Sequence, residues 1–209
     1  MTSGVHSYSR QGGWTSSHSF YYECTYKTLE DYKVSLQKLE NKEKELIQSN
    51  KDVEPEIRFS IIHNGTNMLE NECYRHATST HLFACMTIEA FLNHYGVKRL
   101  GEAYYKRNLE RVGITEKLSI LILACLGSVI KNDAELIKKT RALFDARNRL
   151  VHPKSREIDF GNLHQYVNSH PKDLPIIDYV DDMEYVLSEL SKLDPAIHKS
   201  FEFALLPNK

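Results

Sequence analysis

Phe144-Asp145-Ala146-Arg147-Asn148-Arg149-Leu150-Val151-His152-Pro153 ends an amphipathic helix, and the apolar face of this helix must be covered by other helices. Arg147 and Asn148 both fall where this pattern expects apolar side chains. Because a buried guanidinium without a partner is unfavourable, the pattern predicts either a hydrogen-bonded network or a functional site at this helix end. The two apolar stripes that they interrupt, at seven-residue spacing, are Leu136, Leu143 and Leu150, and Ile137, Phe144 and Val151.

The composition of the 209-residue chain favours a single packed domain, since 41% of its residues are hydrophobic. The formal net charge of -1 gives no overall attraction to nucleic acid or membranes, so any polyanion site must come from local clustering. No signal peptide is recognisable, and the most apolar segment, 118–126, is too short to span a membrane. We therefore expect a soluble cytoplasmic protein without a membrane partner. Its widely spaced cysteines are typical of reduced thiols: Cys24, Cys73, Cys85 and Cys125.

The pattern along the chain predicts an all-α fold, because helical periods recur and strand alternation is nearly absent. We expect a loosely ordered N-terminal arm over 1–27, a single helical domain over 28–195 and a C-terminal tail over 196–209. Helices are predicted over about 28–47, 66–95, 102–111, 116–126, from 135 into the opening stretch, and 177–193.

Local signals set these boundaries. Thr28 followed by Asp31 predicts an N-cap, and Gly127 predicts a helix end. Pro55 interrupts the pattern, and the segment 58–65 after it is compatible with either a short extended piece or a helical turn.

Two polar residues also lie on an apolar face of the helix over 66–95. Glu89 and Asn93 are one turn apart and continue the stripe of Leu82 and Met86. We expect both to orient Arg147 rather than to touch a substrate. An ion pair between Glu89 and Arg147 would hold the helices in register without any chemistry, and this structural interpretation remains open.

Arg147, Asn148 and His152 together have the chemistry of a phosphodiester site. An arginine holds phosphate oxygens bidentately and stabilises the charge of the transition state, while a histidine moves protons near neutral pH. Arg147 and His152 are five residues apart, which is about 140° of rotation on a straight helix. The two side chains therefore meet only if Pro153 releases His152 from helical geometry.

The run Arg147-Asn148-Arg149-Leu150-Val151-His152-Pro153 resembles the Arg, polar residue, three residues, His signature of the HEPN superfamily, many of whose members are metal-independent ribonucleases. Thr87-Ile88-Glu89-Ala90-Phe91-Leu92-Asn93 resembles the central helix of these proteins, and Thr115-Glu116-Lys117-Leu118 resembles the start of their following helix. The resemblance covers about 66–155 and leaves the first 60 residues unplaced.

The HEPN resemblance implies an antiparallel up-and-down helical bundle that forms a homodimer, with the two motifs in a shared cleft. His152 would then activate the ribose 2′-hydroxyl or protonate the leaving oxygen, Arg147 would stabilise the scissile phosphate, and Asn148 would orient one of them. The products would be a 2′,3′-cyclic phosphate and a 5′-hydroxyl, with neither a metal nor another cofactor. RNA is the expected substrate, and Arg149 and Lys154 are expected to bind its backbone. Kinship also implies a toxin or a role in phage or plasmid defence, with an antitoxin or other protein as partner.

Other interpretations stay open. The Arg-to-His spacing recurs from Arg58 to His63, so spacing alone does not identify the site. A non-catalytic dimerisation, nucleotide-binding or partner-binding module would use the same cleft, and the basic residues around it would then form an ordinary solvated face. Cys73 and His76 share a helix face, but no second pair completes a metal site, and we expect His76 and His81 at the surface.

Overall fold

The computed structural model describes residues 7–9, 12–14, 16–151, 170–194 and 197. This part of the chain is helical apart from one short antiparallel ribbon, so the predicted all-α class is confirmed. The elements are β1 (Ser7–Ser9), β2 (Gly12–Trp14), α1 (His18–Ser49), α2 (Pro55–Leu100), α3 (Glu102–Asn108), α4 (Ile114–Leu126), α5 (Glu135–Val151), the 3-10 turn η2 (Pro171–Asp173) and α6 (Ile176–Leu193).

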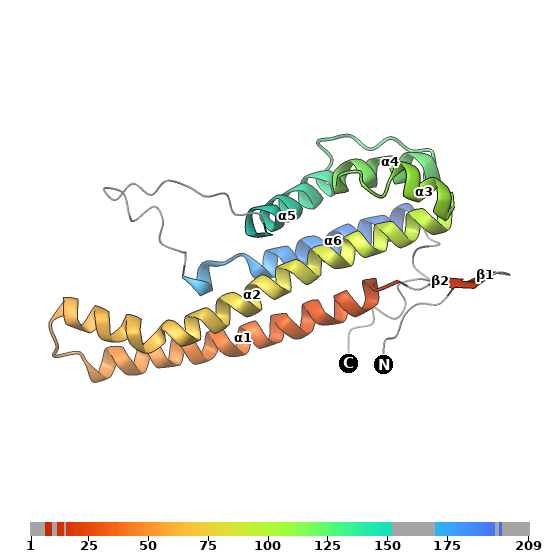
Figure 1. Ribbon diagram of the computed structural model, residues 1–209. Helices are drawn as coiled ribbons and strands as arrows, with labels where there is room; N and C mark the ends of the chain where they lie inside the picture. The colour runs from red at the N-terminus through yellow and green to blue at the C-terminus, as the bar shows by residue number, and fades with distance from the viewer. Residues whose placement is uncertain (1–6, 10–11, 15, 152–169, 195–196, 198–209) are drawn as a thin grey trace.

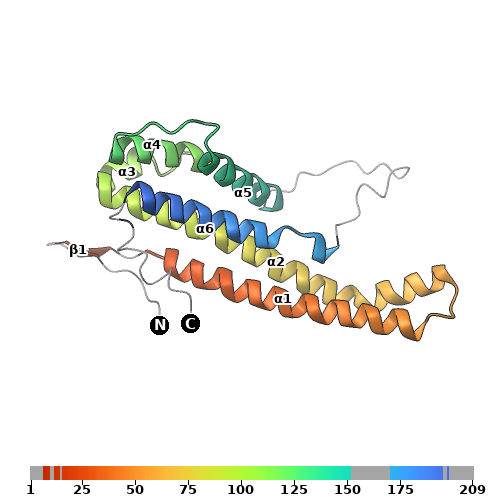
Figure 2. The ribbon, with the colours of Figure 1, turned by 180° about the vertical axis from the view of Figure 1, so that it is seen from behind.

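Helices α1 and α2 form a long antiparallel hairpin, and the remaining helices pack along one end of it (Figure 1). The other end of the hairpin, where α1 turns into α2, projects beyond α5 and α6 (Figure 2). Gly65 faces Leu46 of α1 there, and a Cβ at this position would lie 2.7 Å from Leu46 Cδ1, at the end of that side chain. Pro55 occupies the first turn of α2, where its missing N–H does no harm. The helix then continues through 58–65, so the helical alternative is the one that the chain adopts.

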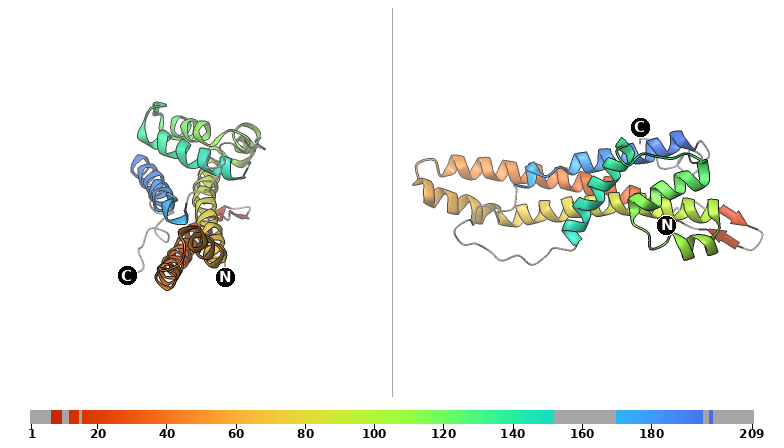
Figure 3. Two further views of the ribbon diagram at one scale, coloured as in Figure 1. Left: turned by 90° about the vertical axis from the view of Figure 1, so that its left-hand side faces the viewer. Right: turned by 90° about the horizontal axis from the view of Figure 1, so that it is seen from above.

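Helix α6 lies beside α2, and α5 crosses over both at a steep angle in the view from above (Figure 3). The core lies where these three helices meet, and its fully buried residues include Ile88, Leu92, Leu143, Met183 and Leu187. The amphipathic faces that the sequence assigns to α5 and α6 therefore meet the nearly all-apolar second half of α2.

The N-terminal end of the bundle differs from the prediction. Helix α1 starts at His18 rather than at Thr28, and the Thr28 hydroxyl donates back to the Cys24 carbonyl at 2.8 Å, as in a helix interior. His18 is fully buried and its ring meets Phe91 edge to face at 5.7 Å between centroids. Residues 18–27 are thus helical because they pack on α2, a tertiary contact that local capping signals do not reveal.

Helix α2 begins at Pro55 instead of near residue 66, whereas the bounds of α4 and α6 follow the prediction closely. Gly127 has the left-handed φ of 66° that ends α4, and α6 begins at Ile176. In the described part of the chain no helix combines the length and apolar character needed to cross a membrane. The predicted tail lies outside the described residues except for Ile197, which is buried.

Candidate functional site

Helix α5 carries the polar motif on its last turn. Arg147 is half-buried and lies one turn after the fully buried Leu143, on the same face of the helix. Asn148 is exposed instead of inward, and Leu150 and Val151 are 41% and 42% exposed. The cause is that the last turn of α5 runs past the helices that cover Leu143 (Figure 3).

Arg147 and Asn148 contact each other through their side chains. Arg147 Nη1 donates to Asn148 Oδ1 at 3.0 Å on the last turn of α5. His152, Pro153 and Lys154 lie outside the described residues, so the predicted meeting of Arg147 with His152 stays a prediction.

Glu89 and Asn93 occupy the predicted face of α2, but Asn93 has other partners. Its Oδ1 accepts from the Tyr105 hydroxyl and from Lys117 Nζ, the latter at 2.8 Å. Within the described part of the chain, neither residue makes a hydrogen bond or an ion pair with Arg147. Asn93 is therefore a partner of Lys117, and the expected orientation of Arg147 by these two residues is not seen.

Lys117 is a buried charged residue that the sequence reasoning missed. It is 2% exposed, and burial lowers the pKa of its ammonium group, while the nearby Glu89 and Glu110 carboxylates act in the opposite direction. The sequence could have indicated it, because Lys117 lies on the same face of α4 as Leu121. A lysine on a buried helix face needs a hydrogen-bond acceptor inside the protein.

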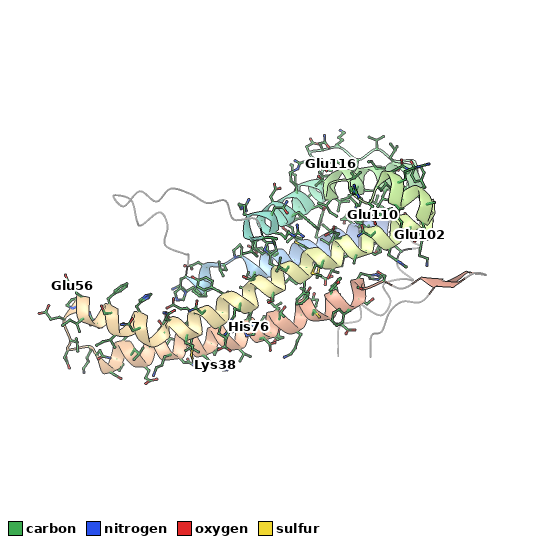
Figure 4. The ribbon with its side chains drawn as sticks, viewed as in Figure 1. Lys38, Glu56, His76, Glu102, Glu110 and Glu116 are labelled. Atoms are coloured by element: carbon green, nitrogen blue, oxygen red, sulfur yellow. The ribbon has the colours of Figure 1, made fainter. Side chains whose placement is uncertain are left out.

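Asn93 and Tyr105 also face a cleft between α2 and α3, which we name the α2–α3 cleft. It has a volume of about 450 Å³, and the start of α1 closes one side of it. The ring nitrogen His94 Nε2 is sealed from solvent and makes no hydrogen bond in the described structure. Figure 4 shows Glu110 and Glu102 near this end of the bundle. The polar and charged side chains that α2 and the segment after it contribute to its wall are Glu89, Asn93, His94, Tyr105, Lys106 and Glu110.

A second cleft lies beside the motif, where α2 meets the last turn of α5 and the start of α6, and we name it the α2–α5–α6 cleft. It has a volume of about 610 Å³. Arg149 enters its wall from α5, whereas Arg147 points to another side of the same turn. Its polar and aromatic side chains are Asn71, Tyr74, Thr78, His81, Arg149 and Tyr179.

His81 forms the floor of this second cleft. It is only 4% exposed, so its expected surface position is wrong, and the cause is that α5 and α6 cover this part of α2. His81 Nε2 lies 3.0 Å from the Leu143 carbonyl oxygen, and its ring stacks on Tyr179 at 4.1 Å. Burial is the main cause that lowers the pKa of His81. The Leu143 hydrogen bond acts in the opposite direction, and the charges of Arg149 and Arg147 lower the pKa further.

The two clefts therefore lie along one helix and differ in charge. The α2–α3 cleft has two carboxylates in its wall, and the α2–α5–α6 cleft has an arginine and no carboxylate among its described residues. The second cleft and the Arg147–Asn148 pair share the last turn of α5, so we treat them together as the candidate site. Comparisons with protein-family models, with curated proteins and with solved structures found no match to this chain.

Proposed function

We propose that this protein is a metal-independent endoribonuclease of the HEPN type. The observation that carries the proposal is the Arg147–Asn148 pair: Arg147 is half-buried on α5, and its guanidinium donates at 3.0 Å to the amide oxygen of the exposed Asn148. Among the described residues, no carboxylate forms an ion pair with this guanidinium. Such an arginine can bind a phosphodiester through its remaining N–H groups.

In the proposed reaction, Arg147 binds the scissile phosphate and stabilises the negative charge that develops on its oxygens. Asn148 holds the guanidinium in the orientation seen here. His152 takes the proton of the ribose 2′-hydroxyl or delivers one to the leaving 5′-oxygen. The 2′-oxygen attacks phosphorus and the P–O5′ bond breaks, which leaves a 2′,3′-cyclic phosphate and a 5′-hydroxyl. A homodimer that places two such motifs in one cleft, and a toxin or defence role with a protein partner, extend the proposal.

A second candidate function is a non-catalytic module that binds a partner or a second copy through the same helix end. The exposed Leu150 and Val151, 41% and 42% exposed beside the motif, favour this alternative because apolar side chains at a helix end serve protein contacts well. The alternative predicts loss of assembly, without any effect on RNA, when Arg147 is replaced.

The deciding experiment measures cleavage of a labelled RNA by the wild-type chain and by Arg147→Ala and His152→Ala. We expect each replacement to lower the cleavage rate by about 10²–10⁴-fold, without loss of activity in EDTA, and the products to end in a cyclic phosphate. Arg141→Ala is the matched control, since Arg141 is an exposed arginine on the same helix. Cleavage that survives His152→Ala would refute the catalytic assignment. Absence of cleavage by the wild type, with a dimer lost in Arg147→Ala, would favour the binding module.

A further inference from the structure

Thr78 in the α2–α5–α6 cleft differs from the other threonines of the helix interiors. Each of the others donates its hydroxyl to the carbonyl one turn earlier, at 2.7–2.9 Å. The half-buried Thr78 makes no such bond, and its hydroxyl has no hydrogen-bonding partner in the described structure. A hydroxyl in this position remains available to a ligand. The residues that do bond back are Thr25, Thr28, Thr66, Thr80, Thr87 and Thr140.

His81 offers a second polar atom to the same cleft. Because its Nε2 lies 3.0 Å from a carbonyl oxygen, that nitrogen carries the hydrogen and Nδ1 keeps a lone pair. Nδ1 makes no hydrogen bond to a described residue and is not among the atoms sealed from solvent. Asn71 adds a further acceptor, since its Nδ2 donates to Asn67 and its own Oδ1 is left without a donor.

The shape and charge of the cleft define the ligand further. The stacked rings of His81 and Tyr179 give one wall an aromatic surface, and Arg149 stands exposed at the rim. Arg149 is the charged side chain of the described wall, and its guanidinium can hold an anionic group. A planar ring with hydrogen-bonding edges, joined to a phosphate, fits this combination, and a volume of about 610 Å³ accommodates it.

We infer that the α2–α5–α6 cleft is a nucleobase subsite, which binds one base of the RNA strand whose neighbouring phosphate lies at Arg147. The inference rests on the proposed ribonuclease function and adds to it the residues that determine which phosphodiester bond of the RNA is cleaved. Arg149 binds the phosphate of the bound nucleotide, and the His81–Tyr179 wall packs on the base. Arg147 and Arg149 lie on different sides of one turn of α5, so the two phosphates that they bind lie on different sides of this helix, whose diameter with side chains is about 10–12 Å.

The hydrogen-bonding groups of the cleft select the base. His81 Nδ1 and Asn71 Oδ1 are acceptors, and Thr78 Oγ1 can donate or accept. Adenine and cytosine each present an exocyclic amino group as a donor, whereas uracil presents a carbonyl oxygen in its place. The subsite therefore prefers adenine or cytosine, with an amino group at this position, over uracil.

The test measures binding of labelled 2′-O-methyl hexanucleotides of adenine, cytosine or uracil to the full chain by fluorescence anisotropy. These probes lack the 2′-hydroxyl that cleavage needs, so binding is read independently of catalysis. We expect the adenine and cytosine probes to bind about five- to tenfold more tightly than the uracil probe. Thr78→Val and Asn71→Leu should reduce this preference to less than about twofold, and Thr78→Ser should restore it.

Ser79→Ala is the matched control, because Ser79 is a half-buried hydroxyl residue of α2 outside the cleft wall, and it should leave the preference unchanged. Equal affinity for the three probes, no binding of any probe, or an unchanged preference in both cleft variants would overturn the subsite. If the wild type binds with the predicted preference but does not cleave RNA, the subsite stands and the proposed ribonuclease function fails. If cleavage depends on Arg147 and His152 but the cleft variants cut at unchanged positions, the function stands and the subsite fails.

Discussion

The two clefts along α2 use polar residues in opposite ways. In the α2–α3 cleft, Asn93 Oδ1 is bonded to Tyr105 and Lys117, so the buried cation and its acceptor satisfy each other. In the α2–α5–α6 cleft, Thr78 and His81 Nδ1 have no partner in the described structure. The two sites are twelve residues apart from His81 to Asn93, which is about 18 Å along a helix.

The difference separates residues that stabilise the fold from residues that are available for binding. A polar group that is bonded inside the protein contributes to folding, and its partner becomes unsatisfied when the group is removed. A polar group that faces an open cleft without a protein partner contributes little to folding, because water can form hydrogen bonds with it in both the folded and the unfolded chain. Replacements in the first cleft should therefore change stability, and replacements in the second should change ligand binding.

The largest effect is expected from Asn93→Ala. Among the described residues, the change leaves Lys117 Nζ, on a residue only 2% exposed, with the Glu110 carbonyl at 3.4 Å as its remaining acceptor. Loss of the close partner of a buried ammonium should lower the free energy of unfolding by about 2–4 kcal/mol, measured by urea denaturation.

Lys106→Ala provides the control for this prediction, because Lys106 is an exposed residue of the same cleft wall that pairs with Glu102. Its effect on stability should stay below about 0.5 kcal/mol. A loss of less than about 1 kcal/mol in Asn93→Ala would mean that Lys117 does not depend on Asn93, and the contrast between the clefts would weaken.

Arg149→Gln should produce the next largest effect, on RNA binding. If Arg149 contacts one phosphate of a single strand, its loss should lower affinity about tenfold and reduce the slope of log affinity against log salt by about 0.7. Arg149 is exposed, so the unfolding free energy should change little. Lys106→Gln at the rim of the α2–α3 cleft is the matched control, and an equal loss in both variants would show that RNA binding is not confined to the second cleft.

A smaller effect concerns pH, because each cleft contains one buried histidine. Burial lowers the pKa of both His81 and His94 below their ordinary value of 6.5, and Lys98 adds to the effect at His94. In the pH range between the lowered value and 6.5, the unfolded chain binds more protons than the folded chain. Stability should therefore fall as the pH decreases below 6.5, by at most about 1.4 kcal/mol per pH unit for each histidine.

Urea unfolding at several pH values between 7.5 and 5 tests this prediction in wild type and in His94→Phe. The variant keeps an aromatic ring of similar size in the buried position but cannot take up a proton, so its stability should fall less steeply on acidification. A steeper fall in the variant would show that protonation of His94 stabilises the fold, contrary to the direction given by its burial.

The sequence predicted which side chains are unusual better than it predicted their partners. Arg147 and Asn93 stood out because polar residues interrupted apolar stripes, and both lie near the core. The partner of Asn93 is Lys117, twenty-four positions away on another helix, and periodicity within one helix contains no information about such a contact. Asn148 was misplaced because the pattern does not tell where the covering helices end.

Apart from Arg149, which was expected to bind RNA, the residues of the α2–α5–α6 cleft were not recognised from the sequence, for a related reason. His81 was expected at the surface, since nothing local shows that α5 and Tyr179 of α6 cover it. The start of α1 at His18 was missed in the same way, because its cause is packing on α2. Helix class and the ends of α4 and α6 depend on local periodicity and on Gly127, and these were predicted correctly.

The smallest effect on the free energy of unfolding should come from Thr78→Val. Because the Thr78 hydroxyl has no partner in the described structure, exchanging it for a methyl group of similar size should change the unfolding free energy by less than about 0.5 kcal/mol. Thr87→Val is the matched comparison on the same helix, since the buried Thr87 donates to the Phe83 carbonyl at 2.8 Å, and it should cost about 1 kcal/mol. If Thr78→Val is as destabilising as Thr87→Val, the hydroxyl serves the fold. If it is neutral for folding and still removes the preference for bases with an amino group, the two clefts of α2 have separate tasks.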